Sequence, residues 1–516
     1  MSADPRDASV RSLLEYRASE NADGVFALAP ETARSLSFSE LLRSARHLAA
    51  FLTGQGIAPG AHIAMLLPNG LQAVRFFIGI MAADRVVVPL SLIAQAGQLA
   101  YIVEHADCAA VFAAPEFEPR LRTALAGVSR AVAVFVVEAD GLWKNETGAL
   151  PGWPEAEPKA DDPALLMYTS GTTGHPKGVL LSHANILAGA RFVSAAHELN
   201  TADRVLAVLP LYHINAQIVT VLAPLYHGGS LVMPQRFSTH AFWALADEQR
   251  CTWLNVVPTM IAFLLGDSAD ANADILRRLD RSRLRFCRSA SAPLPPKHHQ
   301  AFEERFGVPV VETMGLTETA APAFANSCDP ARRKIGSPGQ AYGNEARVID
   351  AETERELPNG IAGEIVVRGQ NVTTGYYKAP EETRRAFTAE GWLRTGDLGY
   401  RDADGFYFIT GRRKELIIKG GENIAPREID EVLLQHPAVL EAAAVGVPDA
   451  VYGQEILAGI VLRRGAHCNE ATLIAFCRER LGAFKAPRYL TFLSELPKGP
   501  SGKVQRIRLL ESWPGG

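Results

Sequence analysis

The segment YTSGTTGHPKG, residues 168–178, combines glycines with hydroxyl side chains and a lysine within eleven positions. Glycines let backbone N–H groups approach an anion closely, because no Cβ stands in the way. The spacing differs from that of a Walker A loop, since Pro176 stands where its second glycine belongs and Gly178 follows Lys177. We therefore expect a phosphate-binding loop of another type. The groups expected to contact phosphate are those of Thr169, Ser170, Gly171, Thr172, Thr173, Gly174 and Lys177.

Three charged residues elsewhere could complete a nucleotide site. Glu318 lies in ETMGLTET, and a carboxylate beside phosphate needs a cation between them, for which Mg²⁺ is suited. Asp397, in RTGDLG, can accept hydrogen bonds from both hydroxyls of a ribose. Arg412, in GRRK, can orient that carboxylate or reach a phosphate. Taken singly, each residue fits an ordinary surface or turn position, so the prediction depends on the set.

Two further residues stand in contexts that could serve catalysis. His213, in LPLYHINAQ, follows an apolar strand, where a single histidine is more often structural. Lys503, in LPKGPSGKVQR, has proline and glycine on its N-terminal side. That composition is typical of a loop, from which a lysine can reach a site at some distance.

Helices alternate with short apolar strands along the chain, which is the pattern of an α/β protein. Ser39 can cap a helix whose apolar residues recur at helical spacing and which ends at Gly54. HIAMLLP and DDPALLMYTS are expected to be buried strands, and the second runs into the phosphate loop. GVLLSH is expected to be the strand that leaves it. A helix with Ile186, Ala190 and Val193 on one face should follow.

The clearest change of pattern falls at GRRKELIIKGGENIAPREIDEVLLQHP. A β-rich stretch precedes it, in which Asp404-Gly405 signals a hairpin. After it, Pro426 opens a helix that stops before Pro437, whose missing N–H cannot continue it. Two apolar segments and a helix that ends at Gly482 complete a compact α+β tail. The sequence thus predicts a large α/β body of layered subdomains with a β-rich section, followed by a small domain.

Length and composition bound the function. A chain of 516 residues exceeds the size of one core, and we divide it into 1–413 and 414–516. The net charge of −4 gives no reason to expect nucleic acid or a membrane surface as a partner. The six cysteines are scattered without a CxxC motif, and the polar N-terminus lacks an apolar signal core, which indicates the cytoplasm. The apolar run 76–94 is broken by Asp84 and Arg85, so a buried helix and strand are expected there rather than a membrane span.

In this order and spacing, the segments resemble the adenylate-forming superfamily, which includes AMP-forming acyl-CoA synthetases, aryl-CoA ligases, adenylation domains and luciferases. The resemblance runs from FSELLRSARHLAAFL to PSGKVQR, almost the whole chain. It implies that the loop grips the β- and γ-phosphates of ATP. It also implies that Thr317 contacts the α-phosphate, that Glu318 binds Mg²⁺, and that Asp397 and Arg412 hold the ribose.

Further roles follow from the same resemblance. Ser291, Ala292 and Pro293 would form one wall of the adenine pocket, and Lys503 would close onto the α-phosphate and the substrate carboxylate. Lys414 would be the hinge of a mobile C-terminal domain, and His213 a gate beside the acyl pocket. Gly420 and Gly421, in KGGEN, would face the pantetheine tunnel of coenzyme A once that domain has turned.

The resemblance implies a reaction in two steps. A carboxylate attacks the α-phosphorus of ATP to give an acyl-adenylate and pyrophosphate, a step that needs positioning and charge neutralisation. A thiol then displaces AMP, after the small domain has rotated about Lys414. The residues around Lys503 resemble those around reversibly acetylated lysines in bacterial members of the superfamily. A lysine acetyltransferase is therefore an expected partner, since acetylation would remove the charge. Nothing in the composition indicates an oligomeric state.

The acid substrate is expected to be short and polar. FCRSASAPL and its neighbours resemble oxalyl-CoA synthetases, and an arginine such as Arg236 or Arg288 can bind a second anionic group bidentately. We therefore favour a dicarboxylate or a sulfonated acetate, although Ala321 replaces a histidine of the oxalyl-type enzymes. Structural arginines, medium-chain or aryl acids, loading of a carrier protein and a luciferase-like oxygenase are the alternatives. The expected pocket residues are His213, Asn215, Ser289, Gly315, Arg236 and Arg288.

Overall fold

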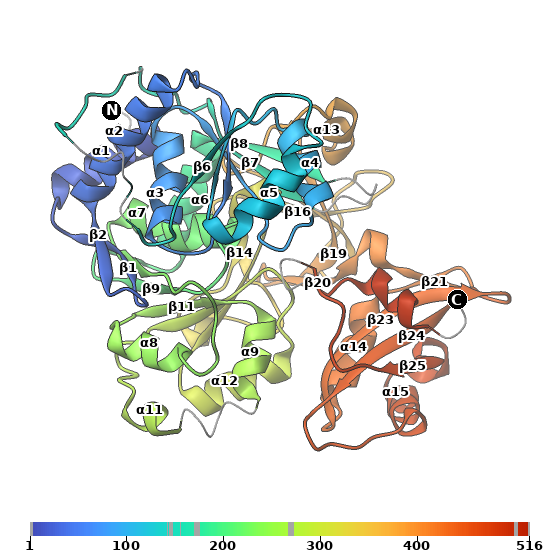
Figure 1. Ribbon diagram of the computed structural model, residues 1–516. Helices are drawn as coiled ribbons and strands as arrows, with labels where there is room; N and C mark the ends of the chain where they lie inside the picture. Colours follow the sequence, from blue (N-terminus) through green and yellow to red (C-terminus); the bar gives the residue numbers. More distant parts are fainter. Residues whose placement is uncertain are drawn as a thin grey trace.

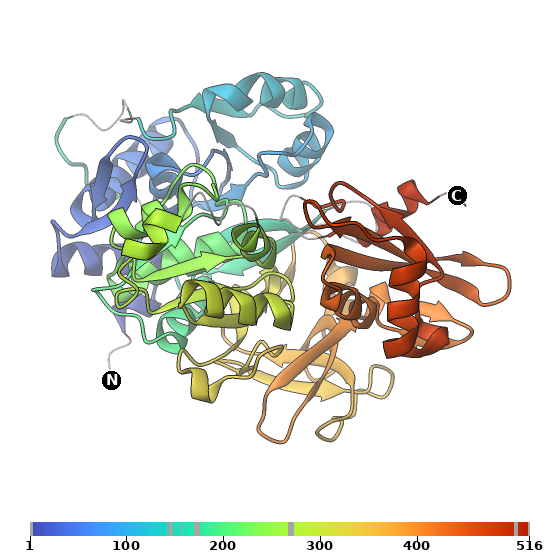
Figure 2. The same cartoon turned by 90° about the horizontal axis from the view of Figure 1, so that it is seen from below.

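A large body and a smaller C-terminal domain make up the protein (Figure 1). The computed structural model describes residues 4–141, 143, 148–154, 156–169, 176–266, 273–499 and 504–513. The body contains three sheets, and the two domains lie side by side when seen from below (Figure 2). This mixed α/β architecture confirms the fold class expected from the alternating pattern.

The first sheet of the body has seven strands and leads into the phosphate loop. Its order is β18-β8-β7-β4-β3-β5-β6, with β7 to β6 parallel and β8 and β18 antiparallel to their neighbours. The apolar segments singled out in the sequence form β3, β7 and β8 as expected. The strands are β3 (His62–Leu66), β4 (Val86–Pro89), β5 (Ala110–Ala113), β6 (Ala133–Val136), β7 (Pro163–Thr169), β8 (Lys177–Ser182) and β18 (Gly375–Tyr376).

The second sheet has nine strands in the order β15-β14-β13-β12-β11-β9-β10-β1-β2. The run from β13 to β1 is parallel, so the carboxyl ends of these strands share one edge. The strands are β1 (Val25–Ala29), β2 (Arg34–Ser37), β9 (Arg204–Ala207), β10 (Ser230–Val232), β11 (Trp253–Val256), β12 (Phe286–Ser289), β13 (Val310–Leu316), β14 (Ala321–Ala325) and β15 (Gln340–Ala341).

The β-rich section before residue 413 is a four-stranded antiparallel sheet, β16-β17-β19-β20. The expected hairpin at Asp404-Gly405 joins its last two strands, and the amide of Gly405 donates to the carbonyl of Asp402. Ile365 and Val367 pack in the core of this sheet. Its strands are β16 (Glu345–Ile349), β17 (Gly363–Arg368), β19 (Leu393–Arg401) and β20 (Tyr407–Arg412).

The C-terminal domain has its own core, around Ile429, Leu433 and Leu473. Helix α14 begins at Pro426, as expected, and the last helix breaks at Gly482, whose φ of 77° only glycine adopts freely. The elements are β21 (Ile417–Lys419), β22 (Glu422–Ile424), α14 (Pro426–Gln435), β23 (Val439–Asp449), β24 (Gly453–Leu462), α15 (Glu470–Lys485) and β25 (Tyr489–Phe492).

The helices of the body cover both large sheets. α6 packs against β7 and β8 of one sheet and against β14 of the other, so it joins them. α3 and β4 account for the apolar run near residue 84. The helices are α1 (Val10–Glu20), α2 (Phe38–Gly54), α3 (Leu71–Ala82), α4 (Ala96–His105), α5 (Glu118–Leu125), α6 (His183–Ala196), α7 (Ala223–His227), α8 (Phe242–Glu248), α9 (Pro258–Leu265), α11 (Ala273–Arg278), α12 (Pro296–Phe306) and α13 (Pro380–Ala386).

The predicted cap of α2 is wrong by two residues. Ser37, and not Ser39, is the N-cap: its hydroxyl accepts the amide of Glu40, and the Glu40 carboxylate accepts the amide of Ser37 at 2.7 Å. This reciprocal capping box needs a glutamate three positions after the cap, which only Ser37 has. The expected end of the helix at Gly54 is confirmed.

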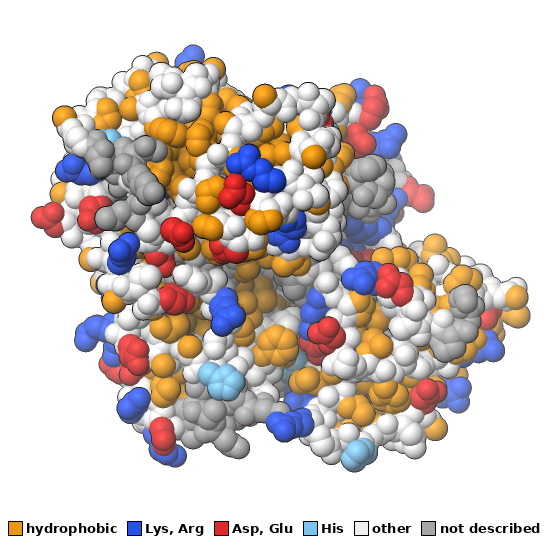
Figure 3. Space-filling model, in the orientation of Figure 1, with side chains coloured by type: hydrophobic (Ala, Val, Ile, Leu, Met, Phe, Trp, Pro, Cys, Tyr) orange, Lys and Arg blue, Asp and Glu red, His pale blue; other side chains and the backbone are white. Residues whose placement is uncertain are grey.

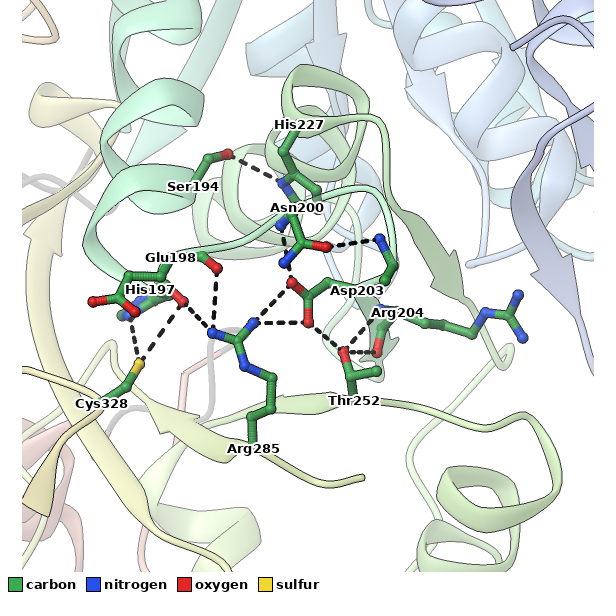
Figure 4. Close-up of polar contacts among 11 residues, drawn as sticks. Ser194, His197, Glu198, Asn200, Asp203, Arg204, His227, Thr252, Arg285 and Cys328 are labelled. Atoms are coloured by element: carbon green, nitrogen blue, oxygen red, sulfur yellow. Dashed lines mark hydrogen bonds and ion pairs between the residues drawn. The ribbon is translucent and has the colours of Figure 1, made fainter. Parts of the chain in front are cut away.

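A buried polar cluster ties the amino ends of three neighbouring strands together (Figure 4). Asp203, before β9, is 3 % exposed and receives two hydrogen bonds of 2.8 Å from the Arg285 guanidinium, which precedes β12. The hydroxyl of Thr252, before β11, donates to the same carboxylate at 2.7 Å. Arg285 also donates to the carbonyl of His197, in the turn after α6. The cluster therefore anchors the nine-stranded sheet at the edge opposite to its carboxyl ends.

Charged side chains and cysteines are distributed as follows. Figure 3 shows acidic and basic side chains interspersed on the face that it presents, without a large patch of one sign. All six cysteines are free thiols. In the part of the chain that the structure describes, no helix combines the length and the apolar character that crossing a membrane requires.

The cluster at Asp203 predicts a loss of stability on substitution. Arg285→Ala should lower the free energy of unfolding by about 3 kcal/mol, because it leaves the buried Asp203 carboxylate without its cation. Urea denaturation followed by tryptophan fluorescence measures the loss. Arg277→Ala is the matched control, because its exposed pair with Asp274 should contribute less than about 1 kcal/mol. Equal stability of the two variants would contradict the anchoring role of the cluster.

Candidate active site

The segments with expected chemistry converge at the carboxyl edge of the nine-stranded sheet. His213 follows β9, Ser291 follows β12, and the turn with Thr317 and Glu318 follows β13. Ligands of open α/β sheets bind at this edge, because loops from several strands meet there. The order of strands thus brings together residues that are about a hundred positions apart in the chain.

The two ends of the phosphate loop sit next to each other. Thr169 ends β7, Lys177 begins β8, and the two residues are register partners in the antiparallel pair. The loop residues Ser170, Gly171, Thr172, Thr173 and Gly174 lie outside the described residues. Lys177 Nζ lies 5.4 Å from the centre of the Tyr376 ring.

Tyr376 connects the phosphate loop to Glu318. Its hydroxyl donates a hydrogen bond of 2.9 Å to Glu318 Oε1, so Lys177 and Glu318 flank the same aromatic ring. Burial raises the pKa of Tyr376, and the negative charge of Glu318 adds to the effect. The tyrosine therefore stays protonated and keeps donating. Sequence reasoning missed it, because GYY after two threonines carries no motif of its own.

Close backbone packing positions the Thr317–Thr319 turn. A Cβ at Gly189, in α6, would overlap the carbonyl oxygen of Ala320, and one at Gly315 would overlap that of Ala321. Thr319 Oγ1 donates to the Ala321 carbonyl at 2.7 Å, and the amide of Thr373 donates to the Glu318 carbonyl at 2.8 Å. The turn is thus held from three sides, which fixes where Thr317 and Glu318 project.

Asp397 and Arg412 form an ion pair, as expected from the sequence, where Arg412 was predicted to orient the Asp397 carboxylate. They are register partners on β19 and β20, and Arg412 Nε lies 2.8 Å from Asp397 Oδ1. The aspartate side chain is 6 % exposed. Burial alone would lower the pKa of Arg412, but the charge of Asp397 and its hydrogen bond, together with the charges of Glu415 and Glu318, outweigh burial and raise the pKa. Arg412 is therefore charged at neutral pH.

The expected adenine wall is a strained turn held by a buried acid. Ser291 has a φ of 74°, a conformation that few residues other than glycine adopt, and Ala292 and Pro293 follow it. The next amide, of Leu294, donates to Glu312 Oε1 at 3.2 Å. Burial raises the pKa of Glu312. Glu312 therefore supports this turn.

A fully buried arginine lies beneath that turn. Arg288, on β12, is 2 % exposed, and its Nη1 donates to Asn215 Oδ1 at 2.8 Å and to Asn255 Oδ1 at 2.9 Å. Burial lowers the pKa of Arg288 to about 9, so it is still charged at pH 7. Among the described residues, no carboxylate forms an ion pair with it. Asn215 Nδ2 in turn donates to Ser291 Oγ at 3.1 Å, which links the arginine to the adenine wall.

The other expected pocket residues are distributed around this cluster. His213 is half-buried just before the π-helical segment Asn215–Leu222, Ser289 is fully buried on β12, and Gly315 is on β13. Arg236 is exposed on the loop after β10 and makes none of the contacts of Arg288. The structure thus brings Arg288 and Asn215 together and leaves Arg236 outside their network. Asn255 was missed, although an asparagine inside the apolar strand WLNVV is itself a signal.

Comparison with known proteins assigns this arrangement to a family. A family model described as "AMP-binding enzyme" matches residues 14–377, and one described as "AMP-binding enzyme C-terminal domain" matches residues 428–503. The chain belongs to the AMP-binding enzyme family. It is an ATP-dependent, AMP-forming acid–thiol ligase of the adenylate-forming superfamily, as the motifs indicate.

The relatives of this AMP-binding enzyme include ligases for small acids. The chain is 53 % identical to a sulfoacetate–CoA ligase of Cupriavidus necator, with 97 % of each chain covered. It is 33 % identical to an oxalate–CoA ligase of Arabidopsis thaliana, with 89 % of this chain and 90 % of the relative covered.

The conformation resembles that of a nucleotide-bound relative. ATP-bound MatB from Rhodopseudomonas palustris, 30 % identical, superposes with a TM-score of 0.88 over 98 % of this chain and 99 % of its own. Apo MatB gives 0.79 over 98 % of both chains. The conformation of this chain is therefore closer to that of ATP-bound MatB than to that of apo MatB.

The C-terminal domain contacts the body at α9. Lys498 Nζ lies 5.4 Å from the centre of the Phe263 ring, in the helix that follows β11. Lys498 also pairs with Glu441 at 2.7 Å and forms a β-bridge with Val504. Lys503 lies outside the described residues.

The expected hinge and the expected coenzyme A loop both lie at the start of the C-terminal domain. Lys414 lies in the 3₁₀ turn Arg413–Glu415 directly after β20, and desolvation, followed by the charge of Arg412, lowers its pKa. Gly420 and Gly421 turn the β21–β22 hairpin with φ of 57° and 84°. This hairpin is on the side of the domain away from the body (Figure 1).

The packing at Gly189 predicts a specific loss of activity. Gly189→Ala should lower pyrophosphate release by at least about tenfold, because the new methyl must displace the turn that carries Thr317 and Glu318. Initial rates with MgATP measure the loss. The matched control is Gly97→Ala in α4, where a Cβ meets nothing within 4 Å and the helix should gain about 1 kcal/mol. Retention of full activity by Gly189→Ala would contradict the account of the turn.

Proposed function

We propose that this ligase activates a short acid that carries a second anionic group, with sulfoacetate as its foremost substrate. The observation that carries the proposal is the buried, charged Arg288, whose only hydrogen-bond partners among the described residues are two neutral amides. A guanidinium is rarely buried without an anion, because desolvation is costly. The sulfonate of the substrate would supply that anion. The identity of 53 % with a sulfoacetate–CoA ligase agrees with this proposal.

In the first step, a carboxylate oxygen of the acid attacks the α-phosphorus of ATP. The bond between the α-phosphorus and the oxygen that bridges it to the β-phosphate breaks. The products are an acyl-adenylate and pyrophosphate. Lys177 and the loop that precedes it would hold the leaving phosphates, Thr317 the α-phosphate, and Asp397 with Arg412 the ribose. Lys503 would approach the reacting carboxylate and phosphate. Such catalysis depends on orientation and charge neutralisation.

Glu318 would bind the Mg²⁺ that accompanies ATP. In the regions of the chain described here, no group of three or more histidine, cysteine or acidic side chains could hold a metal alone. A single carboxylate fits Mg²⁺, which takes its remaining ligands from phosphate and water. The ion supplies charge neutralisation on the phosphates. Tyr376 orients the Glu318 carboxylate for this purpose.

In the second step, the thiol of coenzyme A attacks the carbonyl of the acyl-adenylate, AMP leaves, and the thiol proton is released. The domains 1–413 and 414–516 would move relative to each other about Lys414, which brings Gly420 and Gly421 to the pantetheine channel. A short 3₁₀ turn between two strands can absorb the change of backbone angles. A cytoplasmic lysine acetyltransferase would regulate the first step through Lys503.

The test is a panel of acids in an assay of pyrophosphate release with coenzyme A. The value of kcat/KM for sulfoacetate should exceed that for octanoate and coumarate by at least about 100-fold, because an apolar tail leaves the buried cation unpaired. Malonate and oxalate report how strictly the second anion is selected. Preferential turnover of octanoate or coumarate would overturn the proposal and identify a medium-chain or aryl acid ligase.

The role of Lys503 predicts a separation of the two half-reactions. Lys503→Ala should slow pyrophosphate release by at least about 100-fold, as removal of one transition-state donor does. Thioester formation from a supplied acyl-adenylate should stay within about threefold of the wild type, since Lys503 is then no longer at the site. Arg508→Ala, which removes an exposed pair with Glu511 in the same domain, is the control and should preserve both half-reactions. Equal losses in both half-reactions would refute the division of roles.

A further inference from the structure

The arginine that defines the proposed substrate class is held by neutral groups alone. Both hydrogen bonds of its Nη1 go to amide oxygens, of Asn215 and Asn255. These two side chains are 6 % and 0 % exposed, so water does not replace them. Nε of Arg288 is buried and has no hydrogen-bond partner in the described part of the chain. The positive charge is therefore held in place without being neutralised.

The two amides can present only their oxygens to the guanidinium. Asn255 Nδ2 donates to Asn215 Oδ1 at 3.2 Å, and Asn215 Nδ2 donates to Ser291 Oγ at 3.1 Å. Rotating either amide by half a turn would point its NH₂ group at the guanidinium, so that a donor would face a donor. The chain of hydrogen bonds thus fixes the direction of the guanidinium relative to the adenine wall.

The sheet itself places Asn255 at this position. Asn255 and Arg288 are register partners on the parallel strands β11 and β12, so their side chains project from the same face. The other titratable neighbour, His197, does not compensate the charge: burial, followed by the charges of Arg288 and Arg285, lowers its pKa to about 3. His197 is therefore neutral at pH 7, and no described neighbour supplies a negative charge.

We propose that Asn255, with Asn215, is a positioning residue that sets substrate specificity by orienting Arg288 while leaving its charge for the second anion of the acid. This inference rests on the proposed function. An aspartate at position 255 would have nearly the same shape and would also accept from Nη1, but it would neutralise the arginine from within. Specificity for anionic acids would then be lost, although the arginine and its geometry are retained.

The experiment compares two acids of matched shape. Sulfoacetate carries a sulfonate, and 3,3-dimethylbutanoate carries an uncharged tert-butyl group of similar volume in the same place. The readout is the ratio of their kcat/KM values in the complete reaction with MgATP and coenzyme A. Because this ratio is independent of the fraction of active protein, partial misfolding of a variant does not affect it.

Asn255→Asp should reduce this ratio by at least about 30-fold relative to the wild type, because the internal carboxylate repels the sulfonate. The KM for ATP should change by less than about threefold, since the nucleotide contacts are untouched. Asn69→Asp is the matched control: Asn69 is also buried but contacts the backbone of Leu209 and Leu211. That variant should lose stability and keep the wild-type ratio.

Asn255→Ala provides a second arm that introduces no buried charge. It should reduce the ratio by about tenfold, through a higher KM for sulfoacetate, because the guanidinium loses one of its two acceptors. If both folded variants keep the wild-type ratio while the wild type prefers sulfoacetate, the role of Asn255 is overturned and the proposed function stands. A wild-type enzyme that does not prefer sulfoacetate to 3,3-dimethylbutanoate would instead overturn the proposed function.

Discussion

The contact between the α6 backbone and the turn after β13 sets the geometry of the whole site. At Gly189 the helix lies so close to the Ala320 carbonyl that no side chain fits between them. Because α6 also packs on β7 and β8, this contact fixes the distance between the two large sheets. The phosphate loop belongs to one sheet and the Glu318 turn to the other. The approach of these two segments at Tyr376 therefore depends on how closely α6 packs against both sheets.

Within the third sheet, a different interaction holds two of the expected site residues together. Asp397 and Arg412 pair across β19 and β20, so the carboxylate proposed to hold the ribose is fixed in register with the strand that leads to the proposed hinge. The C-terminal domain begins only two residues later. The proposed movement of that domain about Lys414 would pivot close to the carboxylate that is proposed to hold the ribose. The proposed hinge and the proposed ribose site are therefore adjacent in the structure.

The buried arginine shows how stability and selectivity oppose each other here. Removing a guanidinium from water without an internal anion costs stability, and a carboxylate at position 255 would restore part of it. The chain has two asparagines instead, which satisfy the hydrogen bonds of Nη1 and leave the charge. An anionic acid that binds as proposed would supply the missing stabilisation. A pocket of this kind favours its substrate through electrostatics more than through shape.

Much of the fold and part of the site could be predicted from the sequence. Apolar runs gave β3, β7 and β8, and the Asp-Gly hairpin gave the β19–β20 turn, because these signals are local. The pairing of Asp397 with Arg412 was also anticipated, and their register brings it about. Tyr376, Gly189 and Asn255 were not anticipated, because each acts through a partner at least 33 positions away. Arg236 and Arg288 looked alike in the sequence, and only the packing separates an exposed side chain from a buried one.

The anchoring cluster of Asp203 and Arg285 has a consequence for how such a protein can change over time. It secures β9, β11 and β12 at their amino ends, and the acid is expected to be recognised beyond their carboxyl ends. Residues at the recognition end can then be exchanged without loosening the strands that carry them. Substitutions at that end would then leave the frame unchanged, and we expect a new acid to be adoptable by point substitutions alone.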